Sequence, residues 1–221
     1  MFDCILENNY FNHLDFDNNL KIVKEILHHI NSNVFISLSG GVDSMVLTVI
    51  LKKFYNIECI HINYNNRKES YLEERFLKEW CDFYGIKLHI LKMEIKRENS
   101  NRNFYEKYTN KLRYDFYKRF TDKIILGHHK NDVIENVFTN VMNCKNLIDL
   151  NHLKIENIIN DINVCRPLIN LYKKDIIKFA DDYHIPYFKD STPSWSVRGI
   201  LRNNIFPYIR NYYSNYENQR N

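Results

Sequence analysis

Glycine, proline and alanine are scarce in this sequence. Its 221 residues include five glycines, four prolines and a single alanine, Ala180. Glycine lets the backbone adopt positive φ angles and approach a ligand closely. The positions of the five glycines are therefore informative about where such a backbone is needed.

The sequence also lacks any cysteine pattern typical of a metal or disulfide site. No two of its cysteines form a C-x-x-C pair; they are Cys4, Cys59, Cys81, Cys144 and Cys165. The odd number and wide spacing argue against a disulfide framework and against a structural zinc site. We therefore expect most of them to be buried apolar residues in a reducing compartment.

No apolar run approaches the length that spans a bilayer, and the first residues lack the basic region and apolar run of a signal peptide. These absences predict a cytoplasmic protein without a membrane partner. The net charge of +4 permits a nucleic-acid partner without requiring one.

Short apolar segments, typical of buried strands, alternate with amphipathic segments typical of helices. We expect strands at 34–38, 57–64, 87–93, 123–126 and 162–168. We expect helices at 17–30, 42–55, 69–84, 102–120, 132–144 and 173–184. This alternation predicts an α/β fold with a doubly wound, mainly parallel five-stranded sheet in the order 3-2-1-4-5 and helices on both faces. We divide the chain into an N-terminal helical extension (1–33), a catalytic domain (34–210) and a frayed tail (211–221).

Three of the five glycines are predicted to lie around one crevice. Gly40 and Gly41 fall between the first strand and the first helix of the catalytic domain, and Gly127 ends the fourth strand. The first and fourth strands are neighbours in the predicted order. Ligands of open parallel sheets bind at such a reversal point, beyond the carboxyl ends of the strands.

The residues around the paired glycines suit a phosphate group. The predicted contacts come from Ser39, Gly40, Gly41, Val42, Asp43 and Ser44. The glycines admit an anion, the helix N-terminus attracts it, and the serines offer hydroxyls. Asp43 can hold a Mg²⁺ that bridges phosphates. The loop has neither the lysine of a Walker A motif nor G-x-G-x-x-G. The structural alternative is an ordinary strand–turn–helix connection capped by Asp43, which the complete hexad disfavours.

The hexad SGGVDS at 39–44 resembles the signature of the PP-loop ATP pyrophosphatases, which cleave ATP between the α and β phosphates and adenylate a substrate. Other segments are similar to the tRNA(Ile)-lysidine synthases of that superfamily. They are HINYNNR at 61–67, LRY at 112–114, GHHKNDVIE at 127–135, RPL at 166–168, and DS at 190–191 followed by Arg198, Arg202 and Pro207. The sequence departs from the family pattern at 64–66, Asn131, 144–146 and Gly199.

The resemblance implies an ATP- and Mg²⁺-dependent ligase that adenylates the wobble cytidine of a tRNA and joins L-lysine to it. It implies catalytic roles for Asp43, Arg113, His128, Asp132 and Glu135, and nucleotide contacts from His61 and Gly127. Arg198 and Arg202 would contact the tRNA or the nucleotide, or belong to a surface segment that closes the fold. Many family members continue beyond the region of resemblance into tRNA-gripping domains, so we expect this chain to hold RNA by itself or as a homodimer.

The spacing of His128, Asp132 and Glu135 adds a physical argument. At i, i+4 and i+7 they share one face if the helix begins near His128. A carboxylate or imidazole there could accept the proton that an attacking amine must lose. The alternative is an N-terminal capping network. We expect the neighbouring His129 to pack or to contact the backbone, and the alternative for Arg113 is a solvated side chain.

Two other functions remain open. A tRNA thiolase of the same superfamily would need a sulfur-relaying cysteine or a cluster site, which the scattered cysteines support poorly. A nucleotide- or tRNA-binding protein without turnover is suggested by the altered segments at 64–66 and 144–146. The intact hexad, Arg113 and Asp132 argue against this second alternative.

Overall fold

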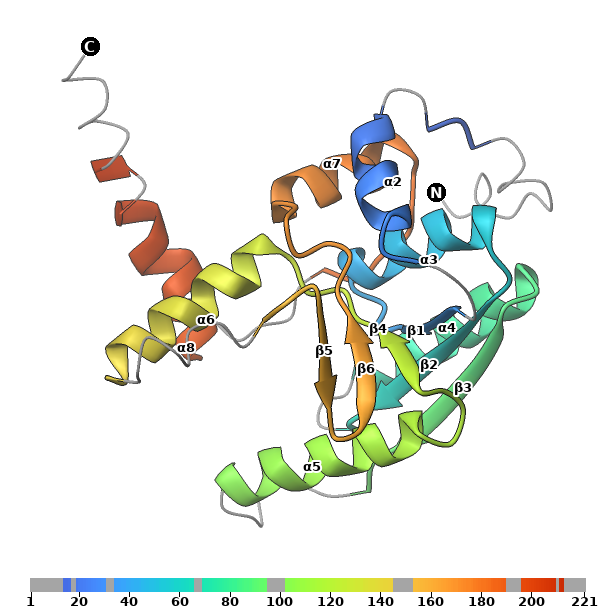
Figure 1. The fold of residues 1–221 in the computed structure, drawn as a ribbon, viewed down its shortest axis with the longest axis horizontal. Coiled ribbons are helices and arrows are strands. Elements are labelled where there is room, and N and C mark those ends of the chain that lie inside the picture. The colour runs from blue at the N-terminus through green and yellow to red at the C-terminus, as the bar shows by residue number, and fades with distance from the viewer. Residues whose placement is uncertain are drawn as a thin grey trace.

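A six-stranded, mainly parallel sheet forms the centre of the molecule (Figure 1). The computed structural model describes residues 14–16, 19–30, 34–65, 69–94, 102–144, 153–189, 196–209 and 211–212. The strands are β1 (Val34–Ser37), β2 (Ile57–Asn63), β3 (Lys87–Lys92), β4 (Lys123–Ile125), β5 (Glu156–Ile159) and β6 (Ile162–Cys165). Their order in the sheet is β3-β2-β1-β4-β6-β5.

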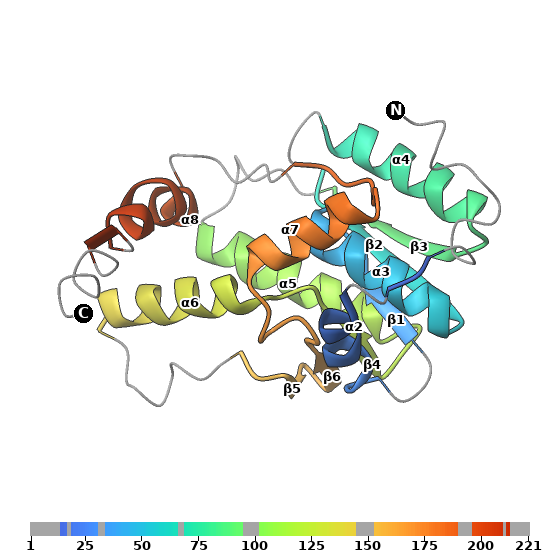
Figure 2. The same cartoon turned by 90° about the horizontal axis from the view of Figure 1, so that it is seen from above.

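Helices cover both faces of the sheet (Figure 2). They are α2 (Leu20–Leu27), α3 (Val42–Phe54), α4 (Ser70–Phe83), α5 (Arg102–Tyr117), α6 (Lys130–Met142), α7 (Lys173–Asp182) and α8 (Val197–Ile200), the last continuing as the π-helical turn η5 (Leu201–Ile205). None of these described helices is both long and apolar enough to cross a membrane.

The predicted parallel strands and their order are confirmed, but the sheet has one strand more than expected. β5 pairs antiparallel with β6 at the sheet edge. Asn160 and Asp161 join the two strands, and both have positive φ angles, as a tight two-residue hairpin turn requires. The sequence pattern did not predict β5, because this strand is short and half polar and its Ile158 side chain is exposed.

Two apolar clusters hold the layers together. The larger one joins α2, α3, α4 and α7 to one face of the sheet, and the smaller one packs α5 against the other. Leu14, Phe16 and Ile26 belong to the larger cluster. Residues preceding β1 thus contribute to the main core, and a domain boundary at residue 33 stays a prediction. Of the expected tail at 211–221, only residues 211–212 lie in the described part.

The crevice predicted from the sheet order has a simple structural basis. β1 and β4 are parallel neighbours, with Ile36 paired to Ile125. The loops that follow these two strands therefore emerge side by side at the carboxyl edge. Beyond this edge, α6 and α8 project together away from the sheet (Figure 1).

Candidate active site

The loop after β1 has the backbone conformation that its glycines allow. Gly40 adopts φ 83°, and Gly41 is the N-cap of α3. Ser44 holds the turn together, because its Oγ accepts a hydrogen bond from Ser39 N at 3.1 Å and donates one to Gly41 O at 3.0 Å. The first N–H groups of α3 thus open toward this loop, an arrangement suited to an anion.

Phe188, which is distant in the sequence, contacts this loop. Its backbone N donates to Gly40 O at 2.9 Å. A Cβ on Gly40 would lie only 3.2 Å from Phe188 Cδ2. Glycine is thus needed at position 40 both for its φ angle and for this close approach.

Gly127 brings the loop after β4 against the loop after β1. A Cβ at this position would lie 3.1 Å from Asp43 Cβ and 3.3 Å from Ser44 N. The expectation that three glycines gather around one crevice is confirmed by this contact. The close approach also fixes Asp43 with respect to the segment that leads into α6.

We expect Gly127→Ala to lower ATP affinity by about tenfold while the protein stays folded. The new methyl group would push on Asp43 and on the backbone of Ser44, and would therefore displace the phosphate loop. ATP affinity is measured by calorimetric titration, and the fold by thermal unfolding.

Gly85→Ala provides the matched control for that substitution. Gly85 has φ 60°, and a Cβ added there would meet nothing within 4 Å, so alanine strains only the backbone. This variant should lose about 1 kcal/mol of stability and keep its ATP affinity. Equal ATP affinity in both variants would show that Gly127 does not support the loop.

Asp43 lines the crevice, and only one of its two carboxylate oxygens makes a hydrogen bond. Its Oδ2 accepts a hydrogen bond from Lys173 Nζ at 2.5 Å. Its buried Oδ1 has no hydrogen-bond partner among the described residues, and His129 Nε2 lies 3.7 Å away. A buried carboxylate oxygen without a donor is costly unless a cation or a ligand donor meets it.

Such an oxygen fits Mg²⁺, which is commonly held by one or two carboxylates together with substrate phosphates and water. The described residues contain no group of three or more His, Cys, Asp or Glu side chains that could bind a metal without a substrate. Asp43 is the residue of this loop that would hold the ion, and the role expected for it stays a prediction.

Lys173 is a member of this site that sequence reasoning missed. It is the first residue of α7, next to the N-cap Tyr172. A cation is unfavourable at a helix N-terminus, where the backbone already presents positive charge. That local conflict was the available signal, because it suggests a partner outside the helix. Here the partner is Asp43.

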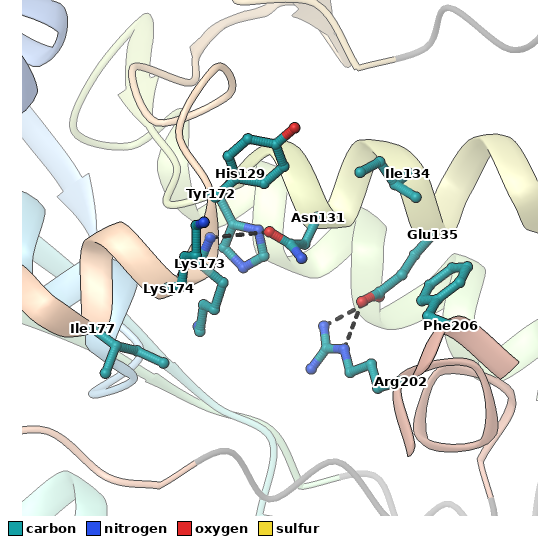
Figure 3. Close-up of a pocket in the computed structure, with 10 residues that line it drawn as sticks. All are labelled: His129, Asn131, Ile134, Glu135, Tyr172, Lys173, Lys174, Ile177, Arg202 and Phe206. Carbon is teal, nitrogen blue, oxygen red and sulfur yellow. Dashed lines mark hydrogen bonds and ion pairs between the residues drawn. The ribbon is translucent and has the colours of Figure 1, made fainter. Parts of the chain in front are cut away.

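Glu135 and Arg202 form a second charged group, and Figure 3 shows the contacts between them. Arg202 Nε lies 2.6 Å from Glu135 Oε1, and Arg202 Nη2 lies 3.1 Å from Oε2. Arg202 Nη2 is also 3.5 Å from Asp132 Oδ1, and Arg198 Nε is 3.8 Å from Glu135 Oε2. Arg202 belongs to the π-helical turn η5, a rare conformation that is frequent at functional sites.

Two adjoining cavities connect these groups. One, of about 420 Å³, is lined by the phosphate loop and by Asp132, Arg198 and Arg202. The other, of about 710 Å³, lies between α6, α7 and η5 (Figure 3). Both are lined by His129, Lys173, Ile177 and Arg202. Arg198 and Arg202 thus line a cavity together with residues of the phosphate loop, and whether they contact the nucleotide or the tRNA stays a prediction.

The helix expected at 132–144 is present as α6, but it does not reach back to His128, which was the condition for a face shared with Asp132 and Glu135. The helix begins at Lys130, and His129 is its N-cap. His129 Nδ1 accepts from Asp132 N at 3.3 Å, while Asp132 Oδ2 accepts from His129 N at 3.1 Å. This capping box ends the extended segment at His129, so His128 does not share a helical face with Asp132 and Glu135. It confirms the backbone contact expected of His129 and the capping alternative for Asp132.

Arg113 and His61 lie near the crevice without lining either cavity. Arg113 Nε donates to Tyr117 OH at 2.6 Å, and Tyr117 OH is 2.7 Å from Ser37 Oγ at the end of β1. His61 is buried, and its Nδ1 lies 2.8 Å from Leu38 O. Burial lowers the pKa of His61. Both residues therefore support the end of β1 from within the protein.

The geometry agrees with a comparison against protein families. Residues 14–209 match the family model described as a PP-loop domain. The chain belongs to the PP-loop family. This membership implies the use of ATP, and it agrees with a phosphate loop at 39–44 that is built without a Walker A lysine.

Curated relatives of this chain include proteins named tRNA(Ile)-lysidine synthase. The tRNA(Ile)-lysidine synthase of Staphylococcus aureus (strain MRSA252) is 30% identical over 196 residues, covering 82% of this chain and 45% of the relative. The tRNA(Ile)-lysidine synthase of Mycoplasmopsis pulmonis is 33% identical over 181 residues, covering 77% of this chain and 60% of the relative. The chain thus spans about half the length of the curated relatives it matches.

A solved structure shows the same fold. The U34-tRNA thiolase NcsA from Methanococcus maripaludis, solved with its [4Fe-4S] cluster, superposes with a TM-score of 0.64 at 19% identity. The match covers 90% of this chain and 78% of the thiolase. At this identity the likeness establishes the α/β architecture alone.

Proposed function

We propose that this PP-loop chain is an ATP-dependent tRNA-modifying ligase of the tRNA(Ile)-lysidine synthase type. It adenylates the wobble cytidine of a tRNA and joins L-lysine to it. The observation that carries the proposal is a cavity lined both by the phosphate loop and by Asp132, next to Glu135 and its arginines. The names of the curated relatives support the same reaction.

In the first step, O2 of the cytidine attacks the α-phosphate of ATP, and pyrophosphate leaves. The cavity presents Lys173, Arg198 and Arg202 to the negative charge that develops on the leaving group. Asp43 would hold Mg²⁺, which neutralises phosphate charge when it is bound. Lys173 donates a hydrogen bond to Asp43 Oδ2, which supports a role for its ammonium group at the same site.

In the second step, the ε-amine of lysine bonds to C2 of the cytidine, the bond from C2 to the AMP oxygen breaks and AMP leaves. The amine gives up its proton to the carboxylate of Asp132, which passes it to water. An ammonium group needs a carboxylate to hold it before it reacts. Asp132 lines the cavity, and its Oδ1 is the oxygen left for this role because Oδ2 is used in the helix cap. The ammonium would share Oδ1 with Arg202, which lies 3.5 Å away.

The alternatives have less support. Among the described cysteines, Cys59, Cys81 and Cys165 are buried and Cys144 is exposed. Among the described residues, no group of three or more His, Cys, Asp or Glu side chains could hold a metal cluster. A binding protein without turnover could hold Mg²⁺ at Asp43 Oδ1 in the same way, so the experiment below is needed to distinguish it. The cytoplasmic location and a homodimer stay predictions.

The proposal is tested by ATP–pyrophosphate exchange with candidate tRNAs and each amino acid in turn. We expect exchange to require a tRNA with cytidine at the wobble position, and labelled lysine alone to become attached to it. The control tRNA carries uridine at that position. Transfer of sulfur instead of lysine would identify a thiolase, and ATP binding without exchange would identify a binding protein.

A further inference from the structure

Arg166, in the segment that follows β6, is a buried cation that the proposed reaction does not use. Its side chain is only 2% exposed. Nη1 donates to Lys154 O at 3.0 Å and to Asn157 Oδ1 at 2.5 Å. Its Nε donates to His128 Nδ1 at 3.2 Å. These three acceptors hold the guanidinium in one orientation.

The contact with His128 restricts the protonation of the imidazole ring. A guanidinium nitrogen is always a donor and never an acceptor. The Nδ1 atom that receives this hydrogen bond must therefore be unprotonated. In a neutral imidazole the single proton then resides on Nε2, and the identity of the partner on one nitrogen sets the state of the other.

We propose that Arg166 fixes His128 as the neutral Nε2–H tautomer, so that Nε2 of His128 is a hydrogen-bond donor instead of a proton acceptor. His128 lies directly after Gly127 and one residue before the N-cap of α6. It thus stands next to the packed junction of the two loops. Arg166 is a positioning residue, because it acts through His128.

The charges around His128 support the same state. Three arginines face it from different elements: Arg113 on α5, Arg166 after β6 and Arg198 on α8, whereas Asp132 on α6 is the acid that opposes them. Burial has the largest effect, and with these cations it lowers the pKa of His128 to about 4 despite Asp132. The ring is therefore neutral at physiological pH.

This assignment refines the proposed reaction and rests on it only for the activity measurements below. A neutral ring whose Nδ1 is occupied can give a hydrogen bond from Nε2 to an oxygen or nitrogen of the substrate. It cannot take the proton that an attacking amine loses. The proton-accepting role considered for His128 from its spacing is thereby excluded.

The tautomer can be measured directly in the ligand-free protein by two-bond ¹H–¹⁵N correlation NMR of the histidine rings. The His128 signals are identified by their loss in His128→Gln. We expect an unprotonated Nδ1 and a protonated Nε2 that persist down to a pH of about 5. A protonated Nδ1, or a titration midpoint near the ordinary value of about 6.5, would overturn the proposal.

Arg166→Gln tests whether Arg166 is the cause. Removal of the charged donor should allow both tautomers and raise the titration midpoint of His128 toward its ordinary value. Arg119→Gln is the matched control, because Arg119 is an exposed arginine whose guanidinium stacks over Phe116. If the Arg166 variant fails to fold, the wild-type spectrum alone decides the tautomer.

Turnover measurements on two variants distinguish a hydrogen-bond donor at position 128 from a general base. Glutamine can donate a hydrogen bond but cannot accept a proton, whereas leucine can do neither. We expect His128→Gln to keep activity within about tenfold of wild type, and His128→Leu to lose about 10²-fold or more. Equal loss in both folded, ATP-binding variants would contradict the donor role. If the wild-type protein showed no turnover with any tRNA, the proposed function would fail while the NMR measurement still decided the tautomer.

Discussion

Asp43→Ala is expected to reduce ATP-dependent release of pyrophosphate by about 10³-fold, with little effect on folding. The carboxylate has one buried oxygen without a hydrogen-bond partner among the described residues, and Lys173 binds the other. The variant removes the charge that would hold Mg²⁺ at the phosphates. It also leaves Lys173 without the acid beside it. Pyrophosphate release is measured with saturating tRNA, and folding by thermal unfolding.

Asp175→Ala is the matched control for this substitution. Asp175 lies in the first turn of α7, just as Asp43 lies in the first turn of α3. Both variants lose the favourable interaction of an acid with a helix N-terminus, about 0.3–1 kcal/mol. Only the Asp43 variant should lose activity. Normal pyrophosphate release by a folded Asp43→Ala protein would remove the loop from the mechanism.

Arg202→Ala should lower turnover by about 10²-fold and leave the salt dependence of tRNA binding unchanged. Its guanidinium makes two short contacts with Glu135, whose side chain is only 3% exposed. Loss of that partner leaves a buried carboxylate whose other arginine, Arg198, lies 3.8 Å away. The free energy of unfolding should therefore fall as well, by about 1–3 kcal/mol.

The measurement compares ATP titration with filter binding of tRNA across a range of salt concentrations. A residue that contacts an RNA phosphate contributes about 1 to the log–log slope. Arg198→Ala is the control, because the Arg198 side chain is 56% exposed and lies farther from Glu135 than Arg202 does. The Arg198 variant should reduce turnover less than the Arg202 variant. Normal turnover by Arg202→Ala together with a slope reduced by about 1 would place Arg202 on the RNA backbone instead.

The parts of the site predicted from sequence depend on local pattern and on strand order. The hexad at 39–44 follows a buried strand and opens a helix, so its conformation is set by neighbouring residues. The contact of Gly127 with Asp43 followed from the predicted adjacency of β1 and β4. The strand β5 was missed because a short edge strand buries little and carries a weak apolar signal.

The sequence by itself determined the alternating fold, the order of the parallel strands and the position of the phosphate loop. Each of these follows from periodicity and glycine placement, which act over a few residues. Only the tertiary structure decided the partners of the charged side chains. Lys173 meets Asp43 across 130 positions, Arg202 meets Glu135 across 67, and Arg166 meets His128 across 38. Such pairs depend on how whole elements pack, and a charged residue in a sequence does not show which distant partner the packing will bring to it.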